Sequence, residues 1–281
     1  WHELLACFHY DISLQQTFEK TSINLTPTTM ATKSVNSLKI LLTVSFIAGF
    51  LFIIIPVKKA PAITGDSQEV WSHQNNKIEI AQENAKKFQG IEIDLVYDNR
   101  INALNVRHDI ESAVTDINLS DVIQATYSTQ CKYWLDIKNL SSTNVEKVLK
   151  ELELISTTFP SFKNRTIIES HQPKELSLLG QNGFYTSYWV PHYEDKVISY
   201  FKFFIRTKPV LLRREFNALS AHKSMLSFLK LFYPRHNFHI WTHDFAKEEL
   251  IPATKELLIN HQVKVLLIDY SSPEIIRHTN D

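Results

Sequence analysis

Hydrophobic and polar residues alternate along residues 90–97, and this period of two predicts a β-strand. Three apolar side chains of the strand point to one face: Ile91, Ile93 and Leu95. Glu92 and Asp94 point to the opposite face, where a half-buried surface strand would leave them in water. A second short strand over residues 103–107 leads into His108, so the two carboxylates also suit a hard cation with an acid or base beside it. The alternation alone leaves both interpretations open.

The same patterns predict a regular succession of strands and helices in the rest of the chain. Main strands are expected over residues 69–73, 90–97, 132–138, 165–170, 183–190, 216–221, 237–241 and 262–269, with residues 103–106 as an added short strand. Helices are expected over residues 78–88, 119–127, 144–156, 174–179, 194–205, 225–232 and 245–259. Ser120 is a candidate N-cap. Eight such units within roughly 210 residues predict a TIM (β/α)8 barrel, with a doubly wound sheet as the alternative.

An uncharged segment precedes these elements. Residues 40–57 contain no charged side chain and lie between Lys39 and Lys58, and this length is close to what a helix needs to cross a bilayer. Residues 60–62 resemble a small-residue cleavage site, so a cleaved signal peptide is the alternative. The chain is expected to have four parts: a disordered or misassigned tail (1–37), a transmembrane or signal-anchor helix (38–58), a linker (59–68) and a barrel (69–281). This organisation predicts a membrane-anchored, single-pass protein with its barrel on the periplasmic or extracytoplasmic side.

Composition excludes several classes of function. The chain of 281 residues has 30 basic and 30 acidic residues, and this balance does not support a nucleic-acid partner bound by phosphate neutralisation. Two cysteines, Cys7 and Cys131, define neither a disulfide framework nor a zinc cluster, and Cys131 is expected to be a small buried hydrophobe. No glycine-rich phosphate loop follows an expected strand, and no Gly-x-Ser-x-Gly elbow is present, which argues against nucleotide binding and an α/β hydrolase.

Polar residues gather where the expected strands end, which in a TIM barrel is where the chemistry lies. Asp136 and Lys138 repeat the spacing of Glu92 and Asp94, so they share a face of their strand. The three carboxylates from two neighbouring strands suit one divalent ion bound through oxygen, with two histidines beside it as base and acid. Lys138 next to the ion indicates an anionic group and hence a phosphate ester. The other polar residues at strand ends are His73, His108, Glu169, His171, Tyr188, His222, Trp241, His243 and Asp269.

Two further groups receive ordinary interpretations. His236, His239 and His243 are close in sequence but are expected to be ordinary polar positions rather than a metal site. The aromatic residues of the expected strand over 183–190 are expected to belong to the core, with one side facing a pocket, rather than to stack on nucleic-acid bases.

The order and spacing of these motifs resemble the phospholipase-C-like phosphodiesterase superfamily, whose best-known members are the glycerophosphodiester phosphodiesterases. The matching pieces are His73, Ile91-Glu92-Ile93-Asp94, His108-Asp109, Asp136-Ile137-Lys138, Ile240-Trp241-Thr242 and Ile268-Asp269-Tyr270. The resemblance spans about residues 70–273. It implies one Mg²⁺ or Ca²⁺ ion with three carboxylate ligands: Glu92, Asp94 and Asp136. It also implies a catalytic pair, His73 and His108, in which one histidine attacks or activates the attacking group and the other protonates the leaving alkoxide. The expected substrate contacts are Lys138, Asn76, His171 and Trp241.

The first-strand motif departs from that of the glycerophosphodiesterases, which usually read His-Arg-Gly followed by Glu-Asn. Here the segment reads His73-Gln74-Asn75-Asn76, without the arginine. The His-x-x-Asn and Asp-x-Lys forms are more similar to the sphingomyelinase D enzymes and menorin-type proteins of the same superfamily. The sequence therefore predicts a metal-dependent phosphoric diester hydrolase that cleaves a glycerophosphodiester or a phospholipid head group. The alternative is an inactive barrel that serves as a membrane-tethered binding or trafficking module.

Overall fold

A computed structural model describes residues 62–191, 216–242 and 250–269, all within the unit Pro56–Asp281. The strands are β1 (Glu69–Ser72), β2 (Gly90–Asp98), β3 (Ala103–Val106), β4 (Lys132–Ile137), β5 (Thr166–Ser170), β6 (Tyr185–Trp189), β7 (Ala218–His222), β8 (Asn237–Trp241) and β9 (Val263–Ile268). The helices are α3 (Ile78–Asn84), α4 (Leu119–Thr126), α5 (Val145–Thr158), α6 (Pro173–Gln181), α8 (Leu226–Phe232) and α9 (Leu250–Leu258). Apart from the helix expected over 194–205, which lies outside the described residues, each expected strand and helix is present, with boundaries that differ by a few residues.

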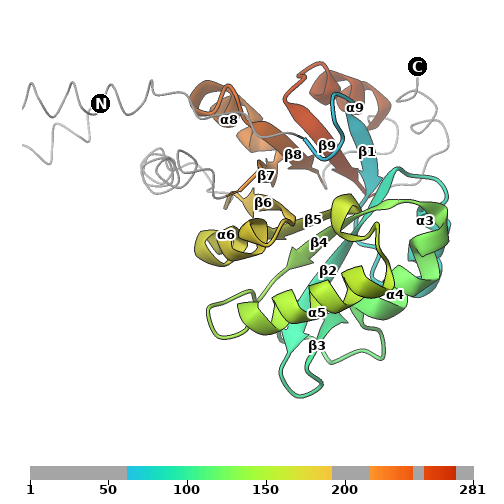
Figure 1. Cartoon of the computed structure of the whole chain (residues 1–281). Coiled ribbons are helices and arrows are strands. Elements are labelled where there is room, and N and C mark those ends of the chain that lie inside the picture. The colour runs from blue at the N-terminus through green and yellow to red at the C-terminus, as the bar shows by residue number, and fades with distance from the viewer. Residues whose placement is uncertain (1–61, 192–215, 243–249, 270–281) are drawn as a thin grey trace, which may run out of the picture. The chain divides into compact units, whose positions relative to one another are not determined.

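The strands form a closed barrel (Figure 1). Their order is β1-β9-β8-β7-β6-β5-β4-β2-β3, and a further pairing between β1 and β2 closes the ring. Every pairing in the ring is parallel, whereas β3 joins the outer part of β2 as an antiparallel strand. The predicted TIM barrel is therefore confirmed, and the doubly wound sheet is wrong because an open sheet would leave two edges. The antiparallel strand confirms the added strand expected over residues 103–106.

Strand β2 is buried along its whole length. The side chains of Glu92 and Asp94 are 2% and 1% exposed, so the interpretation of this strand as a surface strand with solvated acids is wrong. Glu92 lines a pocket, whereas Ile91, Ile93 and Leu95, on the opposite face of the strand, are fully buried. Helices lie around the outside of the strands (Figure 1). Because a closed barrel has no solvent-facing side to its strands, alternation here separates the outer core from the barrel interior.

A cluster of aromatic and aliphatic side chains fills part of the barrel interior. This cluster consists of Trp71, Trp134, Ile167, Val265 and Leu267. The two indoles meet edge to face with their ring centroids 6.4 Å apart, and the Trp71 Nε1–H donates to Glu69 at 2.8 Å. A Cβ atom on Gly90 would lie 2.3 Å from the Trp71 ring, so only glycine lets this indole occupy the interior. Because these side chains fill the interior, the barrel is open only at the carboxyl ends of the strands, which form its mouth.

Helix α4 begins one residue earlier than its expected N-cap. The helix is preceded by Asn118, whose backbone N–H donates to the Asp121 carboxylate at 2.8 Å, and Ser120 is exposed in the first turn. Asparagine is as good an N-cap as serine, and the acid three residues later completes a capping box. The N-cap prediction at Ser120 is therefore wrong by two residues.

The N-terminal prediction lies largely outside the structure. The helix expected over residues 38–58 is not among the described residues. Within residues 62–191, 216–242 and 250–269, no helix combines the length and apolarity that a membrane span requires. The described part of the linker contacts the barrel, since Ile63 packs against the aromatic cluster and the Gln68 side chain donates to the carbonyls of Asn260 and Val263.

Candidate active site

One pocket at the mouth of the barrel collects most of the predicted site residues. Its lining consists of His73, Gln74, Glu92, His108, Trp134, Asp136, Lys138, Glu169, Trp189, Trp241 and Leu267. These residues come from β2, β4, β5, β6, β8 and β9, and from the segments that follow β1, β3 and β4. Parallel strands place their carboxyl ends on one rim, so residues far apart in sequence converge there.

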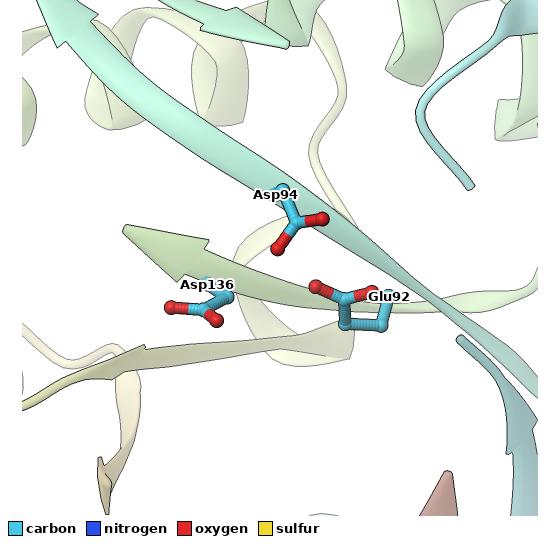
Figure 2. Close-up of side chains that lie close together, drawn as sticks. All are labelled: Glu92, Asp94 and Asp136. Carbon is cyan, nitrogen blue, oxygen red and sulfur yellow. The ribbon is translucent and has the colours of Figure 1, made fainter. Parts of the chain in front are cut away.

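Three carboxylates form the acidic centre of this pocket. Asp94 and Asp136 are Cα partners on neighbouring strands, and Glu92 precedes Asp94 by one strand repeat on the same face. One carboxylate oxygen from each residue lies within 4.8 Å of the others, and Figure 2 shows the three side chains pointing toward one another. Burial raises the pKa of Glu92 well above its ordinary value, and the nearby Asp94 and Asp136 charges raise it further. A cation bound among the three carboxylates would favour their ionised forms.

In this structure Lys138 supplies part of that positive charge. Its Nζ atom lies 2.6 Å from Asp94 Oδ1 and 2.5 Å from Asp136 Oδ2. Burial alone would lower the pKa of the Lys138 ammonium, but the carboxylates of Asp136 and Asp94 outweigh burial and raise it. Asp136 Oδ1 is buried and has no hydrogen-bond partner among the described residues. Three buried carboxylates, one with an oxygen still to be satisfied, fit a single hard divalent ion bound through oxygen.

Each of the two predicted catalytic histidines is held by a carboxylate. His73 Nδ1 lies 2.5 Å from Asp269 Oδ1, and its Nε2 lies 3.8 Å from Glu92 Oε2. His108 Nδ1 lies 2.9 Å from Asp94 Oδ2. A carboxylate on Nδ1 fixes that nitrogen as the donor, which leaves Nε2 of a neutral imidazole as the basic nitrogen. Asp269 was recognised as a polar strand end, but its partnership with His73 was not predicted because 196 positions separate them.

The loop after β1 holds the acidic residues in place. The Gln74 backbone, with φ of 56°, donates from its N–H to Glu92 Oε2 at 2.6 Å. Asn76 Nδ2 donates to Asp94 Oδ2 at 2.7 Å, and Asn76 Oδ1 accepts from the Asp94 backbone N–H at 3.0 Å. The Asn76 side chain is thus engaged with a predicted metal ligand, and its expected substrate contact stays a prediction.

The aromatic wall differs in part from the expected one. Trp241 lines the pocket, whereas the His171 ring stacks on Trp189, with ring centroids 4.0 Å apart, and is not itself in the lining. The expected substrate contacts of both residues stay predictions. Tyr188 stacks on Phe216 and is buried outside the pocket, so the interpretation of Tyr188 as a mouth residue is wrong. Register explains the error, because Glu169 pairs with Ser187, and residues in step with Ser187 on β6 face inward.

Glu169 is a fourth acid in the pocket to which sequence reasoning gave no role. It is 3% exposed, and its Cα pairs with that of Asp136 on the adjacent strand. Burial raises the pKa of Glu169 well above its ordinary value, and the Asp136 charge raises it further. Its position at the end of β5 was visible in the sequence, but its depth within the mouth was not.

The histidines expected to be ordinary polar positions are buried where the structure describes them. His239 is 0% exposed and packs between the rings of Trp134 and Tyr185, and burial lowers its pKa to about 3. His236 is also buried, and His243 lies outside the described residues. Among the described residues, the group whose geometry could hold a metal is Glu92, Asp94 and Asp136, which contains no histidine.

No protein-family model and no curated protein matches the chain. Solved structures do match its fold. A glycerophosphodiester phosphodiesterase from Parabacteroides distasonis has 16% identity and a TM-score of 0.54, with 76% of this chain and 96% of that chain covered. An Oleispira antarctica phosphodiesterase in complex with its product sn-glycerol-3-phosphate has 12% identity and a TM-score of 0.52, with coverage of 76% and 97%.

A third solved structure extends the likeness to phospholipases. A calcium-dependent phosphoinositol-specific phospholipase C from Pseudomonas sp. has 11% identity and a TM-score of 0.51, with 77% of this chain and 93% of that chain covered. At these identities the likeness concerns the fold. The described chain therefore has the barrel fold of the glycerophosphodiester phosphodiesterases and of this phospholipase C, as its sequence resemblance implied.

Proposed function

We propose that this protein is a phosphoric diester hydrolase that uses one divalent ion, Mg²⁺ or Ca²⁺. The observation that carries the proposal is a group of three buried carboxylates, two of which contact Lys138, in a site with two histidines that each contact a carboxylate. The fold shared with phosphodiesterases and a phospholipase C supports the reaction class. An ammonium and two imidazoles around one mouth, together with a bound cation, could stabilise the charge and move the protons of phosphoryl transfer.

In this proposal Glu92, Asp94 and Asp136 hold the ion. When bound, the ion neutralises charge that develops on the phosphoryl oxygens. Lys138 contacts both aspartates at 2.5–2.6 Å, so its ammonium would compete with a bound ion for their oxygens. Lys138 is then available to a phosphate oxygen of the substrate at the same mouth.

The two histidines divide the proton chemistry. Asp269 holds the proton of His73 on Nδ1, so Nε2 of His73 presents its lone pair, either to attack phosphorus or to activate the attacking group. Asp94 binds His108 Nδ1 in the same way and stabilises the protonated imidazole, which donates its Nε2 proton to the leaving alkoxide. His108 is 53% exposed, which suits exchange of that proton with solvent.

The substrate class follows from this chemistry and from the solved relatives. We propose a glycerophosphodiester or a phospholipid head group as substrate, with Trp241 in the pocket lining as one contact and Asn76 and His171 as further contacts. The Oleispira phosphodiesterase carries sn-glycerol-3-phosphate as product, and the Pseudomonas enzyme acts on phosphoinositol, which supports this class.

We also propose that residues 38–58 anchor the protein in a membrane, with the barrel on the extracytoplasmic side. The uncharged run over residues 40–57 supports an anchor, which would keep the barrel near lipid substrates. Cells that express the full chain are fractionated, and the membranes are washed with alkaline carbonate. Retention of the full chain in the washed membrane, with the barrel accessible to external protease, is the expected result. Release by carbonate would contradict an integral anchor.

The catalytic proposal is tested on the full chain purified in mild detergent. Hydrolysis of bis-(p-nitrophenyl) phosphate and of glycerophosphocholine is measured with Mg²⁺, with Ca²⁺ and with EDTA. The expected result is turnover that requires the metal and falls by about 10²–10⁴-fold in His73→Ala. The matched control is His261→Ala, at an exposed histidine between α9 and β9. Absence of metal-dependent turnover, or equal turnover in the two variants, would contradict the proposal. Calorimetric titration with Mg²⁺ and Ca²⁺ would then test the alternative, because an inactive barrel is expected to bind neither ion.

A further inference from the structure

A layer of polar side chains lies inside the barrel, just beneath the pocket. Its members, the polar layer, are Trp134 on β4, Ser187 on β6, Ser220 on β7 and His239 on β8. Residues two apart on a strand share a face, so three members lie one strand repeat below the pocket residues Asp136, Trp189 and Trp241. Ser220 faces the same way, because its Cα pairs with those of Trp189 and His239. All four side chains therefore point into the barrel interior.

The polar layer carries buried atoms without a protein partner in the described chain. Trp134 Nε1, Ser187 Oγ, Ser220 Oγ and both ring nitrogens of His239 have no hydrogen-bond partner among the described residues. Oε2 of Glu169 also lacks one there, and the Cα of Glu169 pairs with that of Ser187. Most buried polar atoms in proteins are hydrogen-bonded, and a buried atom that is not so bonded destabilises the fold. Several such atoms in one region indicate a ligand that they share.

The polar layer also has space for a small ligand. Bulky branched side chains usually fill the interior of a TIM barrel, whereas Ser187 and Ser220 are small. His239 contacts the rings of Trp134 and Tyr185, with centroids 5.2 Å and 5.8 Å away, and neither contact gives its ring nitrogens a hydrogen bond. Trp134 and Glu169 also line the pocket, which connects the polar layer to the mouth of the barrel. A buried site with space and several polar partners is the kind that holds ordered water.

We propose that the polar layer is a binding site for ordered water, which links Glu169 at the pocket to His239 in the interior. A water molecule accepts from the Trp134 indole N–H and donates to Glu169 Oε2 or to the unprotonated nitrogen of His239. The two serine hydroxyls extend the link, because each of them both donates and accepts. This inference goes beyond the proposed function, since it involves neither the divalent ion nor the substrate.

The sign of a stability change tests the site. Urea unfolding of the full chain at pH 7 gives the folding equilibrium constant of the wild type, of Ser187→Ala and of Ser220→Ala. In a dry layer each replacement removes an unpaired buried hydroxyl, so the constant would stay the same or rise. In a hydrated layer each replacement removes a hydrogen bond to water, and the constant is expected to fall by about tenfold. Ser72→Ala is the matched comparison, because the buried Ser72 hydroxyl accepts from Asn84 Nδ2 at 2.9 Å.

Radiolytic labelling of the wild-type chain detects the water directly. A brief X-ray pulse turns bound water into hydroxyl radicals, which oxidise the side chains that the water contacts. Oxidation of His239 is expected, although it is fully buried and is not in the pocket lining. Trp71 is the control and should stay unmodified, because it is fully buried and its Nε1–H already donates to Glu69.

Both results are required. An unchanged or raised folding constant in Ser187→Ala and Ser220→Ala would overturn the water site. A lowered constant without oxidation of His239 would also overturn it, because the serines would then have protein partners. Neither measurement depends on metal or on turnover, so failure of the hydrolase proposal and failure of this inference are seen separately.

Discussion

Nδ1 of His73 lies 2.5 Å from Oδ1 of Asp269, although β1 and β9 stand at opposite ends of the described sequence. The two strands are direct neighbours in the barrel, with Ser72 paired to Ile268, so the residues that follow each strand meet at the mouth. A carboxylate at this nitrogen fixes the imidazole tautomer and aims the opposite nitrogen into the pocket. Closure of the barrel therefore brings His73, the predicted base, next to Asp269, which orients it.

Asp269→Asn is expected to lower kcat by about 10²–10⁴-fold with little change in KM, because an amide can hold His73 in the wrong tautomer. Asp269 is 28% exposed, so its replacement should leave the fold intact. Steady-state kinetics on the full chain measure the effect, and the double variant with His73→Ala should be no slower than His73→Ala alone. Asp116→Asn, at an exposed site, is the matched control. A rise in KM at constant kcat would show that Asp269 binds substrate instead.

Lys138→Gln is expected to bind Mg²⁺ or Ca²⁺ about tenfold more tightly than the wild type while kcat falls. The reason is that the Lys138 ammonium occupies oxygens of Asp94 and Asp136 in the metal-free protein, and its removal ends this competition. Calorimetric titration of the full chain measures the affinity independently of activity. Lys147→Gln, at an exposed lysine that contacts Asn99, controls for loss of charge. Weaker metal binding in Lys138→Gln would mean that the lysine organises the carboxylates rather than competing for them.

The sequence predicted the barrel and its acidic centre because both depend on local periodicity. Alternation fixed which residues of β2 share a face, and the same spacing in β4 placed Asp136 beside Asp94 once the strands paired. The partnership of His73 with Asp269 depends on ring closure, which no local pattern encodes. The choice of Trp189 rather than Tyr188 depends on sheet register, and the expected strand boundaries did not define that register.

Gly90→Ala is expected to destabilise the barrel by about 1–3 kcal/mol. The added Cβ would lie 2.3 Å from the Trp71 indole, which the core holds in place and which cannot move without disturbing Trp134. Urea unfolding of the full chain measures the loss. The double variant Gly90→Ala/Trp71→Phe provides the matched test, because a smaller ring leaves room for the methyl group. Strict additivity of the two single losses would contradict a direct clash.

Glu151→Gln is expected to remove a pH-dependent loss of stability centred in α5. Both carboxylate oxygens of Glu151 accept from the Leu104 backbone N–H, at 3.0 and 2.8 Å, and burial raises its pKa from 4.5 to about 7. Between these values the folded protein keeps the proton and the unfolded chain releases it, so stability is highest below pH 4.5, falls as pH rises to 7 and then levels off. Allowing for partial contact with solvent, the loss is about 1–2 kcal/mol.

The two proteins should therefore be about equally stable near pH 4.5, and Glu151→Gln should be the more stable at pH 8, because its neutral amide carbonyl can still accept from Leu104. Thermal unfolding of the full chain at pH 5 and pH 8 measures the difference, with Glu146→Gln as the exposed control on the same helix. An identical pH dependence in Glu151→Gln and the wild type would mean that the Glu151 carboxylate titrates alike in the folded and unfolded chain. The contact of Glu151 on α5 with Leu104 on β3 would then not make the free energy of unfolding depend on pH.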